Sequence, residues 1–147
     1  MDLFYLLLAF LAGACAPTQA GINSELSMIV RGPMQAALIS FAVGTLALGV
    51  YCVLARSPWP AAEIIKSMPW WLWTGGFLGA FLVASTIFVA PKVGAVSLMV
   101  AMITGQMIIS LFLDHYGWLA YPVYPINGWR ILGILLVVAG VVTIRAS

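Results

Sequence analysis

Charged residues in this chain are confined to the gaps between long uncharged runs, and this spacing limits the folds that the chain can adopt. Five apolar runs, at residues 3–24, 32–55, 67–91, 93–113 and 131–144, contain no Asp, Glu, Lys, Arg or His. Four of them hold 21 to 25 residues. At about 1.5 Å rise per residue, a helix of that length crosses the ~30 Å hydrocarbon core of a bilayer. The sequence therefore predicts a protein that lies largely within a membrane.

The composition excludes a water-soluble fold and a β-barrel. Hydrophobic residues make up 64% of the chain and charged residues 7%, whereas a soluble domain carries about a quarter charged residues. Backbone amides in hydrocarbon need internal partners, so only helices and closed barrels span a bilayer. Barrel strands alternate in polarity at every second residue, but these runs are continuously apolar. We therefore expect an all-α integral membrane protein, with one transmembrane domain over residues 1–147.

The uncharged runs and the prolines between them predict five transmembrane helices. Their approximate bounds are 3–23, 34–55, 70–89, 93–113 and 129–144. Pro17 is expected to kink or interrupt the first helix, which could extend toward Val30, because proline lacks an N–H donor. Residues 90–92 are expected to form a tight turn. The last helix has 14 uncharged residues, and its alternative is a helix that lies on the membrane surface.

Five crossings would divide the cationic residues equally between the two sides of the membrane. The N-terminal side has Arg56, Lys66 and Arg130, and the other side has Arg31, Lys92 and Arg145. Orientation is set chiefly by an excess of Lys and Arg on the cytoplasmic side, and this chain has no excess. One interpretation is a chance tie. The other is insertion in both orientations, which would give an antiparallel homodimer with ten helices in the inverted-repeat plan of many secondary transporters.

Polar and aromatic side chains within the predicted helices are the candidate substrate-binding residues, because a polar group in hydrocarbon needs a partner. Gln19 and Asn23 recur at helical spacing beside the expected proline break, where free backbone groups could face a cavity. Gln106 lies near the middle of the fourth helix and shares a face with Ser110. Trp73 either lines a cavity or anchors the interface. The alternative role for the polar groups is hydrogen bonding between helices.

Glu25 and four glycines complete the candidate residues. Glu25 is the carboxylate nearest to the predicted membrane interior, where it could couple transport to protons or contact a cationic substrate; the alternative is a solvated residue paired with Arg31. The glycines are predicted contacts in a dimer, because small residues let membrane helices approach closely. They form two pairs, Gly75 with Gly79 and Gly133 with Gly140.

The sequence lacks the motifs of soluble enzymes. It contains no P-loop, His-Glu-x-x-His or Gly-x-Ser-x-Gly motif, and it has one histidine in all. Cys15 and Cys52 lie singly within apolar runs, without the spacing of a metal site. The net charge of +2 is small and scattered. We therefore expect no enzyme activity, no cofactor, no metal and no nucleic-acid partner.

Several short stretches, taken in order, carry a family resemblance. They are Gln19–Leu26, Pro33–Gly44, Gly75–Gly79, Gly105–Gln106 with Asp114–Gly117, and Arg130–Gly133. Together they resemble the YdcZ-like branch of the drug/metabolite transporter superfamily, over nearly the whole chain. The resemblance implies a five-helix inner-membrane transporter that works as a dimer, since larger relatives have ten helices in two inverted repeats. It implies no substrate. The mid-membrane glutamate of the four-helix multidrug exporters has no counterpart, because residues 13–17 occupy that depth.

The predicted function is transport of a small organic molecule by a secondary carrier or exporter in the cell inner membrane, with the site at the interface of an antiparallel homodimer. The expected partners are the lipid bilayer, the small-molecule substrate, and a second copy of the chain or a homologous chain. The alternative is a non-transporting subunit that assembles with or stabilises a partner membrane protein. A third interpretation, an enzyme acting on lipid, has only Glu25 and Asp114 to offer for catalysis.

Overall fold

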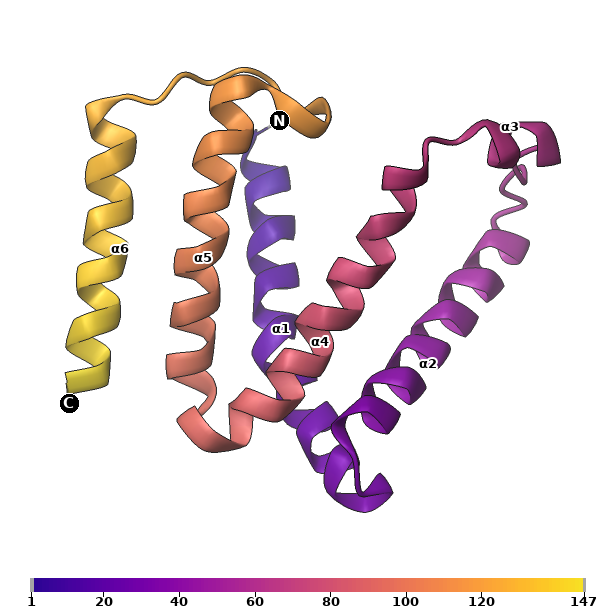
Figure 1. The fold of residues 1–147 in the computed structure, drawn as a ribbon, viewed down its shortest axis with the longest axis horizontal. Helices are drawn as coiled ribbons and strands as arrows, with labels where there is room; N and C mark the ends of the chain where they lie inside the picture. Colours follow the sequence, from indigo (N-terminus) through magenta and orange to yellow (C-terminus); the bar gives the residue numbers. More distant parts are fainter. Residues whose placement is uncertain (1, 147) are drawn as a thin grey trace. The chain divides into compact units, whose positions relative to one another are not determined.

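The computed structural model describes residues 2–146, and its secondary structure over that range is helical (Figure 1). The long helices are α1 (Asp2–Val30), α2 (Pro33–Leu54), α4 (Thr74–Val93), α5 (Ala95–Tyr116) and α6 (Gly128–Ala146). The short elements are α3 (Ala62–Ser67), η1 (Trp70–Trp73) and η2 (Trp118–Ala120).

Four helical segments of the described chain are long and apolar enough to cross a membrane. They are Leu3–Val30, Pro33–Leu54, Trp70–Val93 and Ala95–Tyr116, and Gly128–Thr143 is a shorter apolar helix. The prediction of an all-α membrane protein is confirmed. A fifth crossing by α6 and the ten-helix inverted repeat stay predictions.

The chain divides between Lys92 and Val93 into two compact units. The first unit holds α1, α2, α3, η1 and nearly all of α4, and the second holds α5, η2 and α6. Within the second unit, α5 and α6 lie side by side with opposite chain directions, and residues 117–127 connect them (Figure 1).

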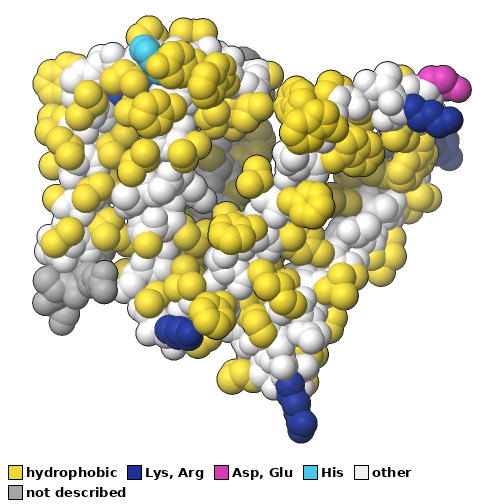
Figure 2. Space-filling model, viewed as in Figure 1, with side chains coloured by type: hydrophobic (Ala, Val, Ile, Leu, Met, Phe, Trp, Pro, Cys, Tyr) yellow, Lys and Arg dark blue, Asp and Glu magenta, His cyan; other side chains and the backbone are white. Residues whose placement is uncertain are grey.

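Small side chains bring three helices of the first unit together near the junction of α1 and α2. The buried cluster consists of Ala36, Ala37, Val83, Ala84 and Ile87, with Leu26 and Val30 packed against it. Alanines at these positions allow close helix contact, as is usual in membrane proteins. Elsewhere most large apolar side chains are exposed. Figure 2 shows them along the helices, with the charged side chains near helix ends, as expected for surfaces covered by lipid or by another subunit.

Two prolines lie inside helices instead of ending them. α1 continues without interruption through Pro17, and α4 continues through Pro91. The expected interruption of the first helix and the expected turn at 90–92 are therefore wrong. The turn falls at Gly94, whose φ of 79° is readily adopted only by glycine. Membrane helices tolerate an internal proline where another group bonds the carbonyl that it leaves free.

α1 and α2 both end in a Schellman motif that has an arginine in the position where glycine is usual. The φ angles of Arg31 and Arg56 are 59° and 49°. In each motif the N–H of the following residue donates to a carbonyl five residues back, at 3.0 Å after α1 and 2.9 Å after α2. A residue other than glycine in this left-handed region costs about 1–2 kcal/mol. Each helix end therefore carries a positive charge at a conformational cost.

Candidate functional site

A cavity of about 470 Å³ lies between α5 and α6 in the second unit. Its lining residues are Ile103, Gln106, Met107, Ser110, Leu111, Asp114, Arg130, Gly133 and Ile134. Those from α5 recur at intervals of three and four residues or their sums, so they share one face of the helix. Gln106, Ser110 and Asp114 form a polar row along this face, each about one turn beyond the last.

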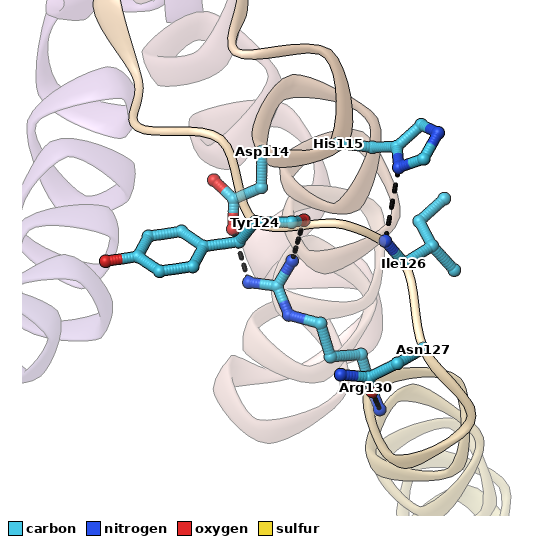
Figure 3. Close-up of polar contacts among 6 residues, drawn as sticks. All are labelled: Asp114, His115, Tyr124, Ile126, Asn127 and Arg130. Atoms are coloured by element: carbon cyan, nitrogen blue, oxygen red, sulfur yellow. Dashed lines mark hydrogen bonds and ion pairs between the residues drawn. The ribbon is translucent and has the colours of Figure 1, made fainter.

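Arg130 of α6 closes one end of this polar row (Figure 3). Its Nη2 donates to Oδ2 of Asp114 at 2.5 Å, and its Nη1 donates to the carbonyl oxygen of Tyr124 at 2.8 Å. The backbone N–H of Arg130 donates to Oδ1 of Asn127 at 2.9 Å, so Asn127 caps the start of α6. The side chains of Arg130 and Asp114 are 33% and 23% exposed. The pair is therefore partly buried and screened less than a surface pair.

The loop between α5 and α6 is tied back to the end of α5. The backbone N–H of Ile126 donates to Nδ1 of His115 at 3.1 Å (Figure 3). The backbone N–H of Tyr124 donates to the carbonyl oxygen of Asp114 at 2.8 Å. Leu119 and Ala120 have φ angles of 55° and 66°, which are uncommon for residues with a side chain. Asp114 and His115 thus hold a strained loop beside the cavity.

The sequence reasoning missed this network. It placed Gln106 and Ser110 on one face but did not extend the row by one more turn, although the same interval of four residues reaches Asp114. The interval of four residues between Ser110 and Asp114 could therefore have indicated that Asp114 belongs to the same row. No spacing rule indicated that Arg130, on the other side of a proline-containing loop, would be the partner of Asp114.

The other predicted substrate-binding residues lie in the first unit. Gln19 lines a cleft of about 230 Å³ between α1 and α2, together with Ser40, Phe41, Gly44, Thr45 and Leu48. Asn23 is 3% exposed, and within residues 2–146 its Nδ2 has no hydrogen-bond partner. Trp73 belongs to η1 and is 57% exposed; it lines neither of these two cavities. Gln19 and Gln106 therefore line different cavities, one in each unit.

Glu25 is exposed on α1, and the described part of the chain contains no salt bridge between it and Arg31.

Among the predicted dimer contacts, a Cβ at Gly79 would lie 3.6 Å from the ring of Phe41, so Gly79 already serves a contact between α2 and α4. A Cβ at the other three glycines would meet no atom within 4 Å. Contact between subunits stays a prediction. Over the described residues, no group of three His, Cys, Asp or Glu could hold a metal ion.

Comparison with known proteins decides the family. The family model described as "Putative inner membrane exporter, YdcZ" matches residues 4–143. The chain belongs to the YdcZ family. It is 32% identical over 85 residues to "Inner membrane protein YdcZ" of Escherichia coli (strain K12), an alignment that covers 58% of this chain and 57% of that protein. The chain thus aligns with little more than half the length of this curated relative. No solved structure matches.

Family membership confirms the resemblance seen in the sequence. This YdcZ-family chain is a multi-pass inner-membrane protein, and its family is one of membrane transporters rather than enzymes. The family description names no substrate.

Proposed function

We propose that this YdcZ-family protein is a secondary carrier or exporter that moves a small organic molecule across the inner membrane. The family supports transport in general, and the cavity between α5 and α6 is the observation that carries the choice of ligand. Its volume of about 470 Å³ lies within the range of roughly 300–1,000 Å³ for small-molecule sites. It combines an apolar wall with a few polar groups, which is the usual composition of such sites.

Gln106 is the central substrate-binding residue in this proposal. Its amide can donate and accept hydrogen bonds, and it lines the cavity between the polar groups and the apolar wall. Gln19, which lines the cleft of the first unit, and Asn23, with its unpartnered amide nitrogen, are further candidates. Trp73 is proposed as an aromatic contact. Glu25, which is exposed on α1, is the proposed coupling residue.

The working unit in this proposal is an antiparallel homodimer with the transport site at its interface. The equal division of Lys and Arg in the sequence supports insertion in both orientations. Two copies would supply ten helices, the size of inverted-repeat transporters. The proposed subunit contacts are Gly75, Gly79, Gly133 and Gly140. An alternating rotation of the helices around the shared site would expose it to each side in turn.

Transport assays in proteoliposomes test this proposal, with neutral, cationic and anionic small molecules as candidate classes. Gln106→Ala should reduce flux of a transported class by about tenfold, because a mid-cavity amide loses its contact with the substrate. Gln35→Ala is the matched control, since Gln35 is exposed and lies outside both cavities. Folded protein without flux for any class would contradict the proposal. Unchanged flux in Gln106→Ala would remove that residue from the site.

Two further measurements separate the parts of the proposal. Single cysteines at the two ends of the chain, labelled from each side of intact cells, report whether both orientations occur. Glu25→Gln should abolish flux driven by a pH gradient if Glu25 couples transport to protons, and unchanged flux would exclude that role. The alternative of a non-transporting subunit predicts a stable heteromer and no effect of Gln106→Ala or Gln19→Ala.

A further inference from the structure

The formal charges that line the cavity between α5 and α6 cancel. Among the residues that the structure describes, Asp114 and Arg130 are its only charged lining residues, and they form a salt bridge at 2.5 Å. Each is the nearest counter-charge of the other, so the cavity offers a ligand a paired dipole rather than a free charge. Burial of an unpaired charge is costly unless the protein supplies a counter-charge.

The contacts of Arg130 also leave little capacity to bind a charged ligand. Its two terminal nitrogens already donate to Asp114 and to the Tyr124 carbonyl. A carboxylate ligand would have to compete with Asp114 for the guanidinium, and an organic cation would have to compete with Arg130 for the carboxylate. Either ligand would leave one protein charge without its partner in a partly buried site. A net-neutral ligand leaves the pair intact.

The polar groups that remain free in the cavity point to hydrogen bonding. Over the described residues 2–146, the side chains of Gln106 and Ser110 make no hydrogen bond to another group of the protein. Thr104 on the same helix, in contrast, donates to the Val100 carbonyl at 2.9 Å. An amide and a hydroxyl one turn apart can bind a group that both donates and accepts. The apolar residues beside them, Ile103, Met107, Leu111 and Ile134, suit a hydrophobic body.

From this arrangement we infer that the cavity between α5 and α6 binds an uncharged amphipathic small molecule, with an apolar body and an amide or hydroxyl group, in preference to an organic cation or a carboxylate. The inference rests on the proposed function, because it names the substrate class of the same site. The amide or hydroxyl bonds to Gln106 and Ser110, and the apolar body contacts the aliphatic wall.

Three probes with one ring and different head-group charge test the inference. They are benzamide, benzoate and benzylammonium, which are neutral, anionic and cationic near neutral pH. Binding to the full chain in lipid nanodiscs is followed by tryptophan fluorescence, and empty nanodiscs correct for partition into lipid. Benzamide should bind saturably with a Kd about tenfold below that of either charged probe, a difference of about 1.4 kcal/mol.

Charge-removing variants sharpen the test. Asp114→Asn leaves Arg130 without its counter-charge, so the preference should shift toward benzoate by about tenfold. Arg130→Gln should shift it toward benzylammonium by a similar factor. The double variant, Asp114→Asn with Arg130→Gln, has no unpaired charge and should keep the preference for benzamide. It still tests the inference if either single variant does not fold. Glu63→Gln and Lys66→Gln, on α3 and outside the cavity, are the matched controls and should change no affinity.

The outcomes separate this inference from the proposed function. Tighter binding of benzoate or benzylammonium than of benzamide by the natural protein, no saturable binding of benzamide, or no shift in either single variant, would overturn the substrate class. Flux in proteoliposomes could still be present in those cases. Conversely, benzamide binding with the expected shifts in a protein that transports nothing would support the site and overturn the transport function.

Discussion

The hydroxyl of Ser24 on α1 lies 3.5 Å from the carbonyl oxygen of Ile87 on α4, the carbonyl that Pro91 leaves without its helical N–H donor. The same hydroxyl donates to the Ala20 carbonyl at 2.7 Å, so its one proton serves acceptors from two helices. The Ile87 contact is long for an O–H···O bond and therefore weak. It nevertheless places a polar group of α1 at the carbonyl that an uninterrupted α4 has to leave free.

Ser24→Ala should lower the free energy of unfolding by about 0.6 kcal/mol, the average for hydrogen bonds between membrane helices. The effect should shrink in a Pro91→Ala background, because Ile87 then regains the backbone donor of residue 91. Unfolding in mixed micelles measures all four proteins of this cycle. Ser27→Ala is the control, since Ser27 donates only within α1 and its cost should be independent of Pro91. Equal costs of Ser24→Ala in both backgrounds would show that the contact is energetically irrelevant.

The contact between Ser24 and Ile87 shows why the sequence predicted the helices better than their ends. The thickness of a bilayer sets a minimum length for every apolar segment that crosses it. The four long helices could therefore be predicted from the lengths of the uncharged runs. The end of α4 could not. The local rule that proline ends a helix does not hold at Pro91, where the hydroxyl of Ser24, 63 residues away in the chain, contacts the carbonyl that the proline leaves free. A single sequence gives no indication of that contact.

The candidate site was predictable to a similar extent. Gln106 could be singled out because an amide at mid-membrane depth is costly, and it does line the larger cavity. The pairing of Asp114 with Arg130 depends on the path of the loop between them. That path includes left-handed residues at Leu119 and Ala120, which no turn rule assigns to these residue types. Sequence patterns identified the polar residue but not the ion pair beside it.

Arg130→Lys should destabilise the second unit by about 1 kcal/mol, because one ammonium cannot reproduce the two directed bonds of the guanidinium. The lost bonds are those to Asp114 and to the Tyr124 carbonyl. Thermal unfolding and the rate of proteolysis within residues 117–127 measure the effect. Arg56→Lys, which keeps the charge outside this network, should leave both unchanged. If Arg130→Lys is as stable as the natural protein and its loop resists proteolysis equally, then the two hydrogen bonds of the guanidinium do not hold the loop.

The loop should loosen when His115 loses its acceptor nitrogen, because Nδ1 of His115 accepts a hydrogen bond from the Ile126 N–H. His115→Ala leaves this part-buried N–H without its partner, which costs about 1 kcal/mol. Hydrogen exchange at the amide of residue 126 should therefore show less protection in His115→Ala than in the natural protein. His115→Asn retains a side-chain acceptor and should keep more of the protection. Equal protection in His115→Ala and the natural protein would show that this bond does not hold the loop.

Replacing Arg31 or Arg56 by glycine should stabilise its Schellman motif by about 1 kcal/mol, because glycine adopts the left-handed conformation without strain. Each replacement also leaves two cationic residues against three across the membrane, and the two variants are biased in opposite directions. If the antiparallel homodimer is the transporter, each variant alone should take one orientation and lose most of its flux, and co-expression should restore it. Cysteine labelling in cells gives the orientation, and proteoliposome flux gives the activity. Full flux from either variant alone, in a single orientation, would rule out the antiparallel arrangement. Transport by a parallel assembly or by a monomer would remain consistent with that result.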